Sequence, residues 1–504
     1  MIREKSGEVY LVGCGPGDPE LITVKGLRLL KDADTIIYDR LINSRILDFA
    51  KPNAELINVG KTTKSTSLQQ DHINQIIIEK AKLGKKVIRL KGGDPFLFGR
   101  GGEESESLRK HDIPFQIVPG VTSAIAAPSY AGIPVTHRRI ASSVTFVSGN
   151  EDIDKANSNI NWDAIGNTGG TIVVLMGRNK LKMITDKLIK AGLNPDTPAA
   201  LIRWGSEPHQ KTITASVANI SIQADTAKLL PPVALVVGEV VNLRNELNWF
   251  ETLPLVGKRI LVTRTRNQAS KLSALLTQHG AIPIELPAIE IVPINIKELQ
   301  SKLRIINEFS WIVFTSSNAV HIFFEALYDA GFDSRHLFDV KIAGIGTVTK
   351  LSLEKYGIKN IIIPEIFNTD TLGDLLVKQV IKGQNILLPR SELGLNEFVT
   401  KLQSAGTQVT EIDIYKTVIP EQSKKLSTEI FQDGIDIATF TSSSTVNGLV
   451  EVLGGINQLK DVNIACIGPV TQAAIEKVGL ASNILAPEST VESLVEAIKA
   501  HFTE

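Results

Sequence analysis

Residues 87–104 read VIRLKGGDPFLFGRGGEE, and this stretch decides how the first half of the chain folds. It opens as a short apolar strand and then breaks at Lys91 to Pro95, which can continue neither a strand nor a helix. In open α/β sheets, ligands bind outside the carboxyl ends of the strands, where glycines let them approach the backbone. The carboxylate of Asp94 suits a ligand hydroxyl, ammonium or sulfonium. The stretch therefore predicts a ligand site, the alternative being an ordinary turn whose glycines serve only its geometry.

Four further apolar runs between residues 8 and 118 end in the same way, in GCGPGD, YDR, VGK and PGVTS. Five such strand ends predict a parallel sheet with one edge given over to binding. The first loop does not match G-x-G-x-x-G, so a dinucleotide site is not indicated. Asp18 is expected to cap one helix that begins at Pro19 and continues through Leu30.

The composition describes an ordinary soluble globular protein, with 504 residues, 43% hydrophobic residues and a formal net charge of +0. This length predicts three or four domains, and the neutral charge speaks against general binding to nucleic acid or membranes. The two cysteines, Cys14 and Cys466, form no metal-binding spacing and no disulfide framework. With no signal-peptide pattern and no membrane-length apolar run, a cytoplasmic location is expected.

A second αβ unit is predicted from Ser143, with strands near residues 144, 172, 199 and 232, followed by a short linker at about residues 248–257. The remainder of the chain repeats itself. ILVTR at 260–264 returns as ILLPR at 386–390, and FTSSNAV at 314–320 returns as FTSSSTV at 440–446, both 126 positions later (386 − 260, 440 − 314). AGIGTVT at 343–349 returns as ACIGPVT at 465–471, 122 positions later (465 − 343). Three matched elements in one order predict two similar lobes.

The first-half motifs VYLVGCGPGDPELIT, YDRLI, VGK, VIRLKGGDPFLFGRGGEE, VPGVTSAIAAPSYAGIPVTHR, LMG and VALVVGEVV resemble the uroporphyrinogen-III C-methyltransferase family. The resemblance covers about residues 8–250 and implies the two-domain tetrapyrrole methylase fold, with subdomains at about 1–138 and 139–250. It also implies a homodimer formed through this half, and methylation of uroporphyrinogen III at C-2 and C-7 by S-adenosyl-L-methionine. The products would be precorrin-2 and S-adenosyl-L-homocysteine. A methylase of RNA or protein is the alternative, which the YDRL and THR motifs and the neutral charge disfavour.

The family's cofactor contacts carry over, motif by motif, to nine positions of this sequence: Pro16, Gly92, Gly93, Asp94, Leu97, Thr122, Ser123, Met176 and Gly205. The family's proposed acid–base pair carries over to Asp39 of YDRL and Lys61 of VGK. A carboxylate near the ligand can accept the proton that the methylated ring carbon loses, and a cation can steady the charge. A pair that binds substrate without proton transfer is the alternative.

Five charged or titratable residues of the same half are expected to face the substrate, whose carboxylates suit guanidinium groups. They are Arg40, Arg100, Glu103, His137 and Arg138.

The second half, about residues 258–504, resembles uroporphyrinogen-III synthase through KRILVTR, WIVFTSSNAV, AGIGTVT, ILLPR, DIYKTV, FTSSSTV and ACIGPVTQAA. The resemblance implies a two-lobed α/β fold joined by a two-stranded ladder. One lobe would span about 258–290 with 418–504, and the other about 291–417. It also implies ring closure of hydroxymethylbilane with loss of water, without cofactor or metal.

Four residues of this half are expected to matter for that reaction, namely Tyr415 at the hinge and Thr441, Ser443 and Thr471 at strand ends. The tyrosine hydroxyl could help the leaving hydroxyl depart. A purely structural tyrosine, and hydroxyls that only cap their own helices, are the alternatives.

The two implied reactions are consecutive, so the chain would convert a linear tetrapyrrole into precorrin-2 for sirohaem or cobalamin. A strand–turn–helix with G-x-G-x-x-G is not found in the sequence, so oxidation of precorrin-2 is not expected. The rival interpretation is a methyltransferase regulated by a non-catalytic, two-lobed ligand-binding module.

Overall fold

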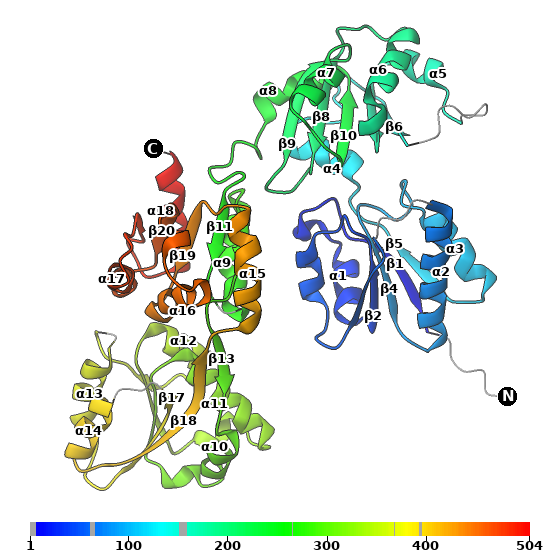
Figure 1. The fold of residues 1–504 in the computed structure, drawn as a ribbon. Helices are drawn as coiled ribbons and strands as arrows, with labels where there is room; N and C mark the ends of the chain where they lie inside the picture. The colour runs from blue at the N-terminus through cyan, green and yellow to red at the C-terminus, as the bar shows by residue number, and fades with distance from the viewer. Residues whose placement is uncertain are drawn as a thin grey trace, which may run out of the picture. The chain divides into compact units, whose positions relative to one another are not determined.

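The structure is a computed structural model that describes residues 7–60, 66–150, 159–264, 266–366, 368–392 and 396–503. The chain divides into two compact units (Figure 1). The first contains the chain up to Lys258 together with Leu276–Ile282, and the second contains nearly all of the remainder. Each unit is described by itself.

The first unit opens with a five-stranded sheet in the order β3-β2-β4-β1-β5, in which every pairing is parallel. Its strands are β1 (Val9–Gly13), β2 (Thr35–Tyr38), β3 (Glu55–Asn58), β4 (Val87–Lys91) and β5 (Phe115–Val118). Helix α1 (Val24–Lys31) covers one face, while α2 (Thr66–Lys82) and α3 (Gly101–Lys110) cover the other (Figure 1). The predicted parallel sheet is therefore confirmed, with the quoted stretch as its central strand.

The single helix predicted to start at Pro19 is wrong. A 3₁₀ turn, η1 (Pro19–Leu21), is capped by Asp18, whose carboxylate accepts the Glu20 N–H at 2.9 Å. The chain then becomes extended at Ile22, and Thr23 caps α1 by accepting the Gly26 N–H at 3.1 Å. Two capping residues five positions apart start two elements, because each satisfies the free N–H groups of its own first turn.

The second sheet of the first unit is mixed, in the order β6-β7-β10-β8-β9. Its strands are β6 (Val144–Ser148), β7 (Thr171–Leu175), β8 (Pro198–Arg203), β9 (Lys211–Ser216) and β10 (Val233–Val237). Edge strand β9 was not expected from the sequence, because KTITAS is half-exposed and polar and carries only one large apolar side chain.

Helix α4 (Ser123–Tyr130) follows the first sheet in the chain but packs against the second. Its Ala124 and Ala127 share an apolar cluster with strands β7, β8 and β10. A Cβ added to Gly205 would lie 2.3 Å from the Cβ of Ala127, so the loop after β8 needs glycine to reach the helix. These contacts hold the two subdomains together.

The expected linker at residues 248–257 contains no helix or strand, but its beginning is packed. The Trp249 and Phe250 rings lie 5.0 and 4.9 Å from the Tyr130 ring, centroid to centroid. Phe250 and Leu255 are buried. Much of this segment therefore belongs to the folded first unit.

The second unit contains two sheets, in the orders β12-β11-β19-β20-β21 and β13-β18-β17-β14-β15-β16. The first sheet is made of β11 (Arg259–Val262), β12 (Ile282–Glu285), β19 (Ile437–Phe440), β20 (Asn463–Cys466) and β21 (Ile484–Leu485). The second is made of β13 (Glu290–Pro293), β14 (Trp311–Phe314), β15 (Lys341–Gly344), β16 (Ile361–Ile362), β17 (Asn385–Ser391) and β18 (Gln408–Val418). We refer to them as the first lobe and the second lobe.

The sequence repeat is a structural repeat. The matched segments form β11 and β17, then β14 and β19, then β15 and β20, in the same spatial order in both sheets. The lobes exchange chain, because β11 of the first repeat pairs with β19 of the second. Antiparallel strands β13 and β18 pair from Glu290 opposite Val418 to Pro293 opposite Tyr415, at the point where the chain passes between the lobes.

Among the described residues, no helix combines the length and the apolar character needed to cross a membrane.

Candidate functional site

Three loops meet at the carboxyl edge of the first sheet because their glycines leave no side chain in the way. The Gly93 N–H donates to the Gly15 carbonyl at 2.7 Å. A Cβ on Gly13 or Gly120 would lie only 2.5 or 2.2 Å from the Gly93 carbonyl oxygen. The loops GCGPGD, KGGDPF and PGVTS therefore converge, as the sequence predicts.

Gly92 differs from these crowded glycines. A Cβ placed on it would find nothing closer than the Leu41 carbonyl oxygen, 4.0 Å away. The space beside Gly92 is open, so internal packing does not explain the glycine, whereas a ligand lying against the backbone would.

Asp94 ties the loops together. One carboxylate oxygen accepts the N–H groups of Phe96 and Leu97 at 2.8 and 3.1 Å, and the other accepts the Gly120 N–H at 3.0 Å. Three acceptor positions of this carboxylate are thus used by the protein itself. The structure gives Asp94 a scaffolding role that the sequence did not predict, alongside its expected contact with a ligand.

The remaining residues expected at the cofactor lie around the same loops and the subdomain boundary. Pro16 is half-buried in the first loop, and Leu97 packs on the apolar cluster of the second sheet. Thr122 caps α4 and Ser123 begins it. Met176 follows β7 with a φ of 59° and is 49% exposed.

Backbone strain is concentrated in the same loops. Among the described residues, eight non-glycine residues have positive φ, and five of them follow β4, β7 or β8: Phe98, Arg100, Met176, Trp204 and Ser206. Strained conformations of this kind persist where surrounding structure over-determines them, and they cluster at functional sites.

Asp39, at the end of β2, is held by a buried arginine. The Nη2 atom of Arg89 lies 2.6 Å from the Asp39 carboxylate, which is 34% exposed. Arg89 in turn donates through Nε to Glu104 at 3.0 Å, and the Nζ atom of Lys91 donates to the same oxygen at 2.9 Å. Asp39 thus has a fixed position at the sheet edge with part of its carboxylate open.

Arg89, Lys91 and Glu104 form a nearly fully buried charge network. Burial acts to lower the pKa of Arg89, but the charges of Glu104 and Asp39 outweigh it and hold the pKa above its usual value. Burial and the charge of Arg89 together lower the pKa of Lys91, although Glu104 opposes them. The second oxygen of Glu104 is buried and accepts no hydrogen bond in the described structure.

This network is not expected from the apolar pattern of residues 87–90. A signal was present: Arg89 and Lys91 are two apart, so both side chains point to one face of an otherwise apolar strand. Cys14 lies in the same region, and burial raises the pKa of its thiol to about 12, which keeps it protonated and unreactive.

Lys61, the expected partner of Asp39, lies outside the described residues. Arg40 and Arg138 are exposed and His137 is half-exposed. Arg100 and Glu103 pair with each other, with Nε and Nη2 of the arginine 2.9 and 2.6 Å from the two carboxylate oxygens. Arg100 thus forms a local ion pair with another residue expected to face the substrate, and the expected substrate contact of both stays a prediction.

In the second unit, Tyr415 is 6% exposed and belongs to the apolar core of the second lobe. Its hydroxyl lies 2.9 Å from the Ser316 hydroxyl, which caps α11 (Ser317–Asp329) by accepting the Ala319 N–H. Tyr415 is thus bound within its own lobe, which supports the structural alternative as much as the catalytic one.

The three hydroxyl residues belong to the first lobe. Thr441 follows β19, and Ser443 starts α16 (Ser443–Leu453) with its hydroxyl donating to the Val470 carbonyl at 3.3 Å. Thr471 lies in the first turn of α17 (Pro469–Lys477) and is buried. Ser442, which was not singled out, is the cap of α16. The loops after β19 and β20 are therefore joined at one sheet edge.

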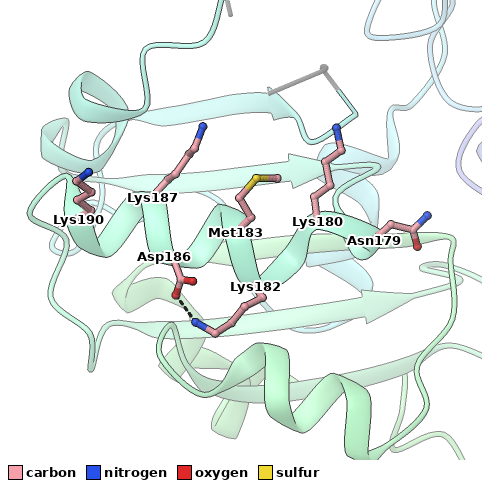
Figure 2. Close-up of a pocket in the computed structure, with 7 residues that line it drawn as sticks. All are labelled: Asn179, Lys180, Lys182, Met183, Asp186, Lys187 and Lys190. Atoms are coloured by element: carbon pink, nitrogen blue, oxygen red, sulfur yellow. Dashed lines mark hydrogen bonds and ion pairs between the residues drawn. The ribbon is translucent and has the colours of Figure 1, made fainter. Parts of the chain in front are cut away.

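A surface hollow of about 440 Å³ lies elsewhere, on α6 (Leu181–Lys190) of the second sheet's subdomain (Figure 2). Figure 2 shows lysine side chains spread along the helix and not converging, with Lys182 paired to Asp186. The hollow contains no residue expected at a cofactor or substrate, and we assign no ligand to it. It is lined by Asn179, Lys180, Lys182, Met183, Asp186, Lys187 and Lys190.

Comparison with known proteins matches the two halves to different families. The family of tetrapyrrole (corrin/porphyrin) methylases matches residues 8–221, and the family of uroporphyrinogen-III synthase HemD matches residues 270–496. The porphyrin biosynthesis protein HemD of Ruminiclostridium josui is 39% identical over 494 residues, which are 98% of this chain and 97% of that protein.

Other relatives match one half. The S-adenosyl-L-methionine-dependent uroporphyrinogen III methyltransferase of Methanosarcina barkeri is 50% identical over 241 residues, 48% of this chain and 94% of that protein. Among solved structures, the uroporphyrin-III C-methyl transferase of Thermus thermophilus complexed with S-adenyl homocysteine is 37% identical, with a TM-score of 0.41. That match covers 47% of this chain and 100% of the other. The chain belongs to the family of the porphyrin biosynthesis protein HemD, as an enzyme of tetrapyrrole biosynthesis that joins a uroporphyrinogen-III C-methyltransferase half to a uroporphyrinogen-III synthase half.

Proposed function

We propose that the chain converts hydroxymethylbilane into precorrin-2 in two consecutive reactions. Residues 258–504 would close the ring with loss of water to give uroporphyrinogen III, and residues 1–250 would methylate it at C-2 and C-7. The observation that carries this proposal is that the two families match opposite halves of one chain, and that 98% of this chain matches a porphyrin biosynthesis protein. The synthase would make the substrate that the methyltransferase uses.

S-adenosyl-L-methionine is the proposed methyl donor, and the name of the Methanosarcina barkeri relative supports it. The open space beside Gly92, at the meeting point of three loops, fits a ligand that approaches the backbone closely. The proposed contacts are the nine positions that the family resemblance implies, with Asp94 shaping the loops through its three backbone hydrogen bonds.

Within this chain, Asp39 is the proposed acceptor of the proton that leaves the methylated ring carbon. Arg89 fixes the carboxylate at 2.6 Å while part of it stays open to solvent. Orientation of the two reactants should contribute much of the acceleration, since the transfer needs an in-line approach. Lys61 is the proposed partner of Asp39 in this acid–base step. The residues proposed to face the substrate are Arg40, Arg100, Glu103, His137 and Arg138.

For the synthase, Tyr415, Thr441, Ser443 and Thr471 remain the proposed residues. The hydroxyl of Tyr415 would help the substrate hydroxyl leave, which requires it to exchange its bond to Ser316 for one to the substrate. Folding the linear substrate into the ring-closing shape should contribute more than any single group.

The test supplies hydroxymethylbilane and S-adenosyl-L-methionine to the intact chain and identifies the product by absorbance and mass. Precorrin-2 is the expected product. Omission of S-adenosyl-L-methionine should stop the reaction at uroporphyrinogen III. If the only ring-closed product is the isomer that hydroxymethylbilane forms without an enzyme, the second half is not a synthase. The alternative of a regulatory ligand-binding module then takes its place.

Uroporphyrinogen III and the linear precursor are the partners, with neither nucleic acid nor membrane involved. A homodimer would form through the methyltransferase half. The product would serve sirohaem or cobalamin synthesis in the cytoplasm.

A further inference from the structure

The two lobes of the second unit carry arginines at matched positions of the repeat, Arg264 and Arg390. Among the described residues, only one of the two has acidic partners. Arg390, in β17, is neutralised by the protein. Its Nη1 atom lies 2.6 Å from the Glu411 carboxylate, and its Nε atom lies 3.0 Å from the Asp413 carboxylate. The arginine of the second lobe is thus paired with two acids of the neighbouring strand β18.

Arg264, which follows β11, has no such partners. It makes no hydrogen bond or ion pair with any residue that the structure describes, and its Nε atom is buried without an acceptor. Burial lowers the pKa of Arg264, and no neighbouring acid opposes that effect. A guanidinium stays charged in proteins, so the first lobe holds a partly buried cation whose charge is uncompensated among the described residues.

The sequence explains the difference. The repeat offset of 126 places Glu285 at the position of Glu411 (411 − 126) and Pro287 at the position of Asp413 (413 − 126). One acid of the pair is therefore absent from the first lobe. The other, Glu285, accepts the Ser273 hydroxyl at 2.6 Å.

Arg264 lies at the edge where the hydroxyl residues of the same lobe are found. Strands β11 and β19 pair in parallel with Val262 opposite Thr439, and this register, continued by two residues, places Arg264 level with Thr441. The Thr263 hydroxyl donates to the Thr439 carbonyl at 2.7 Å and fixes the two strands at this point. Arg264 and Thr441 therefore share one sheet edge.

We infer that Arg264 binds a carboxylate of the linear tetrapyrrole substrate at the carboxyl edge of the first lobe. The inference rests on the synthase activity proposed above and adds to it a named anion-binding residue in one lobe only. A guanidinium and a carboxylate form paired, charge-assisted hydrogen bonds, which the unsatisfied donors of Arg264 would make on substrate binding. In the second lobe, the matching Arg390 is already paired with Glu411 and Asp413.

The test measures uroporphyrinogen III formation by the intact chain, without S-adenosyl-L-methionine, over a range of hydroxymethylbilane concentrations. Arg264→Gln should raise KM by about tenfold to hundredfold, the effect of losing one charge-assisted contact. It should change kcat by less than about threefold, because the contact is made in both ground and transition states. Arg264→Lys keeps the charge but cannot form two parallel hydrogen bonds to a carboxylate. Its KM should therefore lie between those of the wild type and of Arg264→Gln.

Thermal denaturation separates binding from folding. Arg264→Gln should leave Tm unchanged or raise it, since it removes a charge that lacks a partner in the described fold. Arg390→Gln is the matched control: it should lower Tm, because Glu411 and Asp413 lose their partner, and leave KM unchanged.

An active wild-type chain whose Arg264→Gln variant keeps its KM would overturn the inference and leave the synthase proposal intact. A lower Tm in this variant, with kcat reduced and KM unchanged, would assign Arg264 a structural role and overturn it equally. A wild-type chain that forms no uroporphyrinogen III would instead refute the synthase proposal.

Discussion

At the scale of single residues, the position of Asp39 in the first half depends on a buried charge network. Asp39 is anchored by Arg89, and Arg89 is anchored by Glu104, so a carboxylate at the sheet edge is fixed from inside the core. A catalytic base needs a defined position more than it needs strength, because orientation toward the reacting carbon determines its effectiveness.

Replacing Asp39 by Asn tests the proposed base. The change keeps the shape of the side chain and removes its ability to accept a proton. We expect nearly unchanged affinity for S-adenosyl-L-methionine by calorimetry, and methylation slowed by about 10²–10⁴-fold, the usual contribution of general-base catalysis. An unchanged rate at every pH would leave Asp39 and Lys61 as a binding pair.

Glu207 provides a second residue-scale prediction. It lies in the loop after β8 with a side chain that is 12% exposed, and burial followed by the charge of Asp18 raises its pKa to about 7. An acid whose pKa is raised by folding holds its proton more tightly in the folded state. Stability should therefore fall as the pH rises from about 4.5 through about 7, by on the order of 3 kcal/mol in total.

The Glu207→Gln variant cannot lose that proton, so it should be more stable than the wild type at about pH 8. The two proteins should differ little at about pH 4. Denaturant unfolding of the first unit at both pH values checks this. Equal stability at about pH 8 would show that the carboxylate is not penalised in the fold.

At the scale of elements, the glycines after the strands fall into two kinds. Gly120 is required by the fold, because a Cβ there would lie 2.2 Å from the Gly93 carbonyl oxygen. Gly92 has open space beside it. The same substitution to Ala should therefore act differently at the two positions.

Gly120→Ala should lower Tm by several degrees and weaken cofactor binding, since the loops must separate to admit the methyl group. Gly92→Ala should keep the wild-type Tm and weaken cofactor binding alone. Thermal denaturation and calorimetry on both variants distinguish the two cases. A destabilised Gly92→Ala protein would contradict the assignment of open space to ligand.

Most of the elements could be predicted from sequence, and the failures have physical reasons. Apolar runs followed by loop residues identified the five parallel strands, because strands of a parallel sheet covered by helices on both faces are largely apolar. Edge strand β9 was not predicted, because a strand at the edge of a sheet can be polar and partly exposed. The helix at Pro19 failed because Thr23 supplied a second cap.

The site was predictable where it depends on backbone, as in the converging loops, and less so where it depends on side-chain partners. The bond between Tyr415 and Ser316 joins residues 99 positions apart and is an outcome of tertiary packing, whereas Arg100 and Glu103 are three positions apart and their pairing is a local contact that the spacing allows. The predictions for Lys61 and for the roles of the other site residues stay predictions.

At the scale of the whole molecule, the two halves are joined through fewer free residues than the expected linker at about residues 248–257 suggests. Trp249 and Phe250 pack on Tyr130, and the Trp249 ring N–H donates to the Ser129 carbonyl at 3.1 Å. The end of the methyltransferase half is therefore part of its fold and leaves few residues as tether.

A first half cut after residue 247 should consequently be less stable than one cut after residue 258. Loss of the buried Phe250 and the Trp249 contact should cost about 3–5 kcal/mol, as for removal of large aromatic side chains from a core. Comparison of the two fragments by thermal denaturation measures this. Equal Tm values would mean that residues 248–257 act only as a linker.

The exchange of chain between the lobes has a consequence for synthesis on the ribosome. The second lobe is built from a continuous segment, β13 to β18, and can close as soon as that segment has emerged. Strand β11 must wait for β19, because Val262 pairs with Thr439, 177 positions later (439 − 262). At a translation rate of about 5–20 residues per second, the apolar β11 spends roughly 10–35 s without its pairing to β19. We therefore expect the nascent chain to pass through a state with a finished second lobe and an exposed edge on β11, which is open to pairing with another chain until β19 emerges.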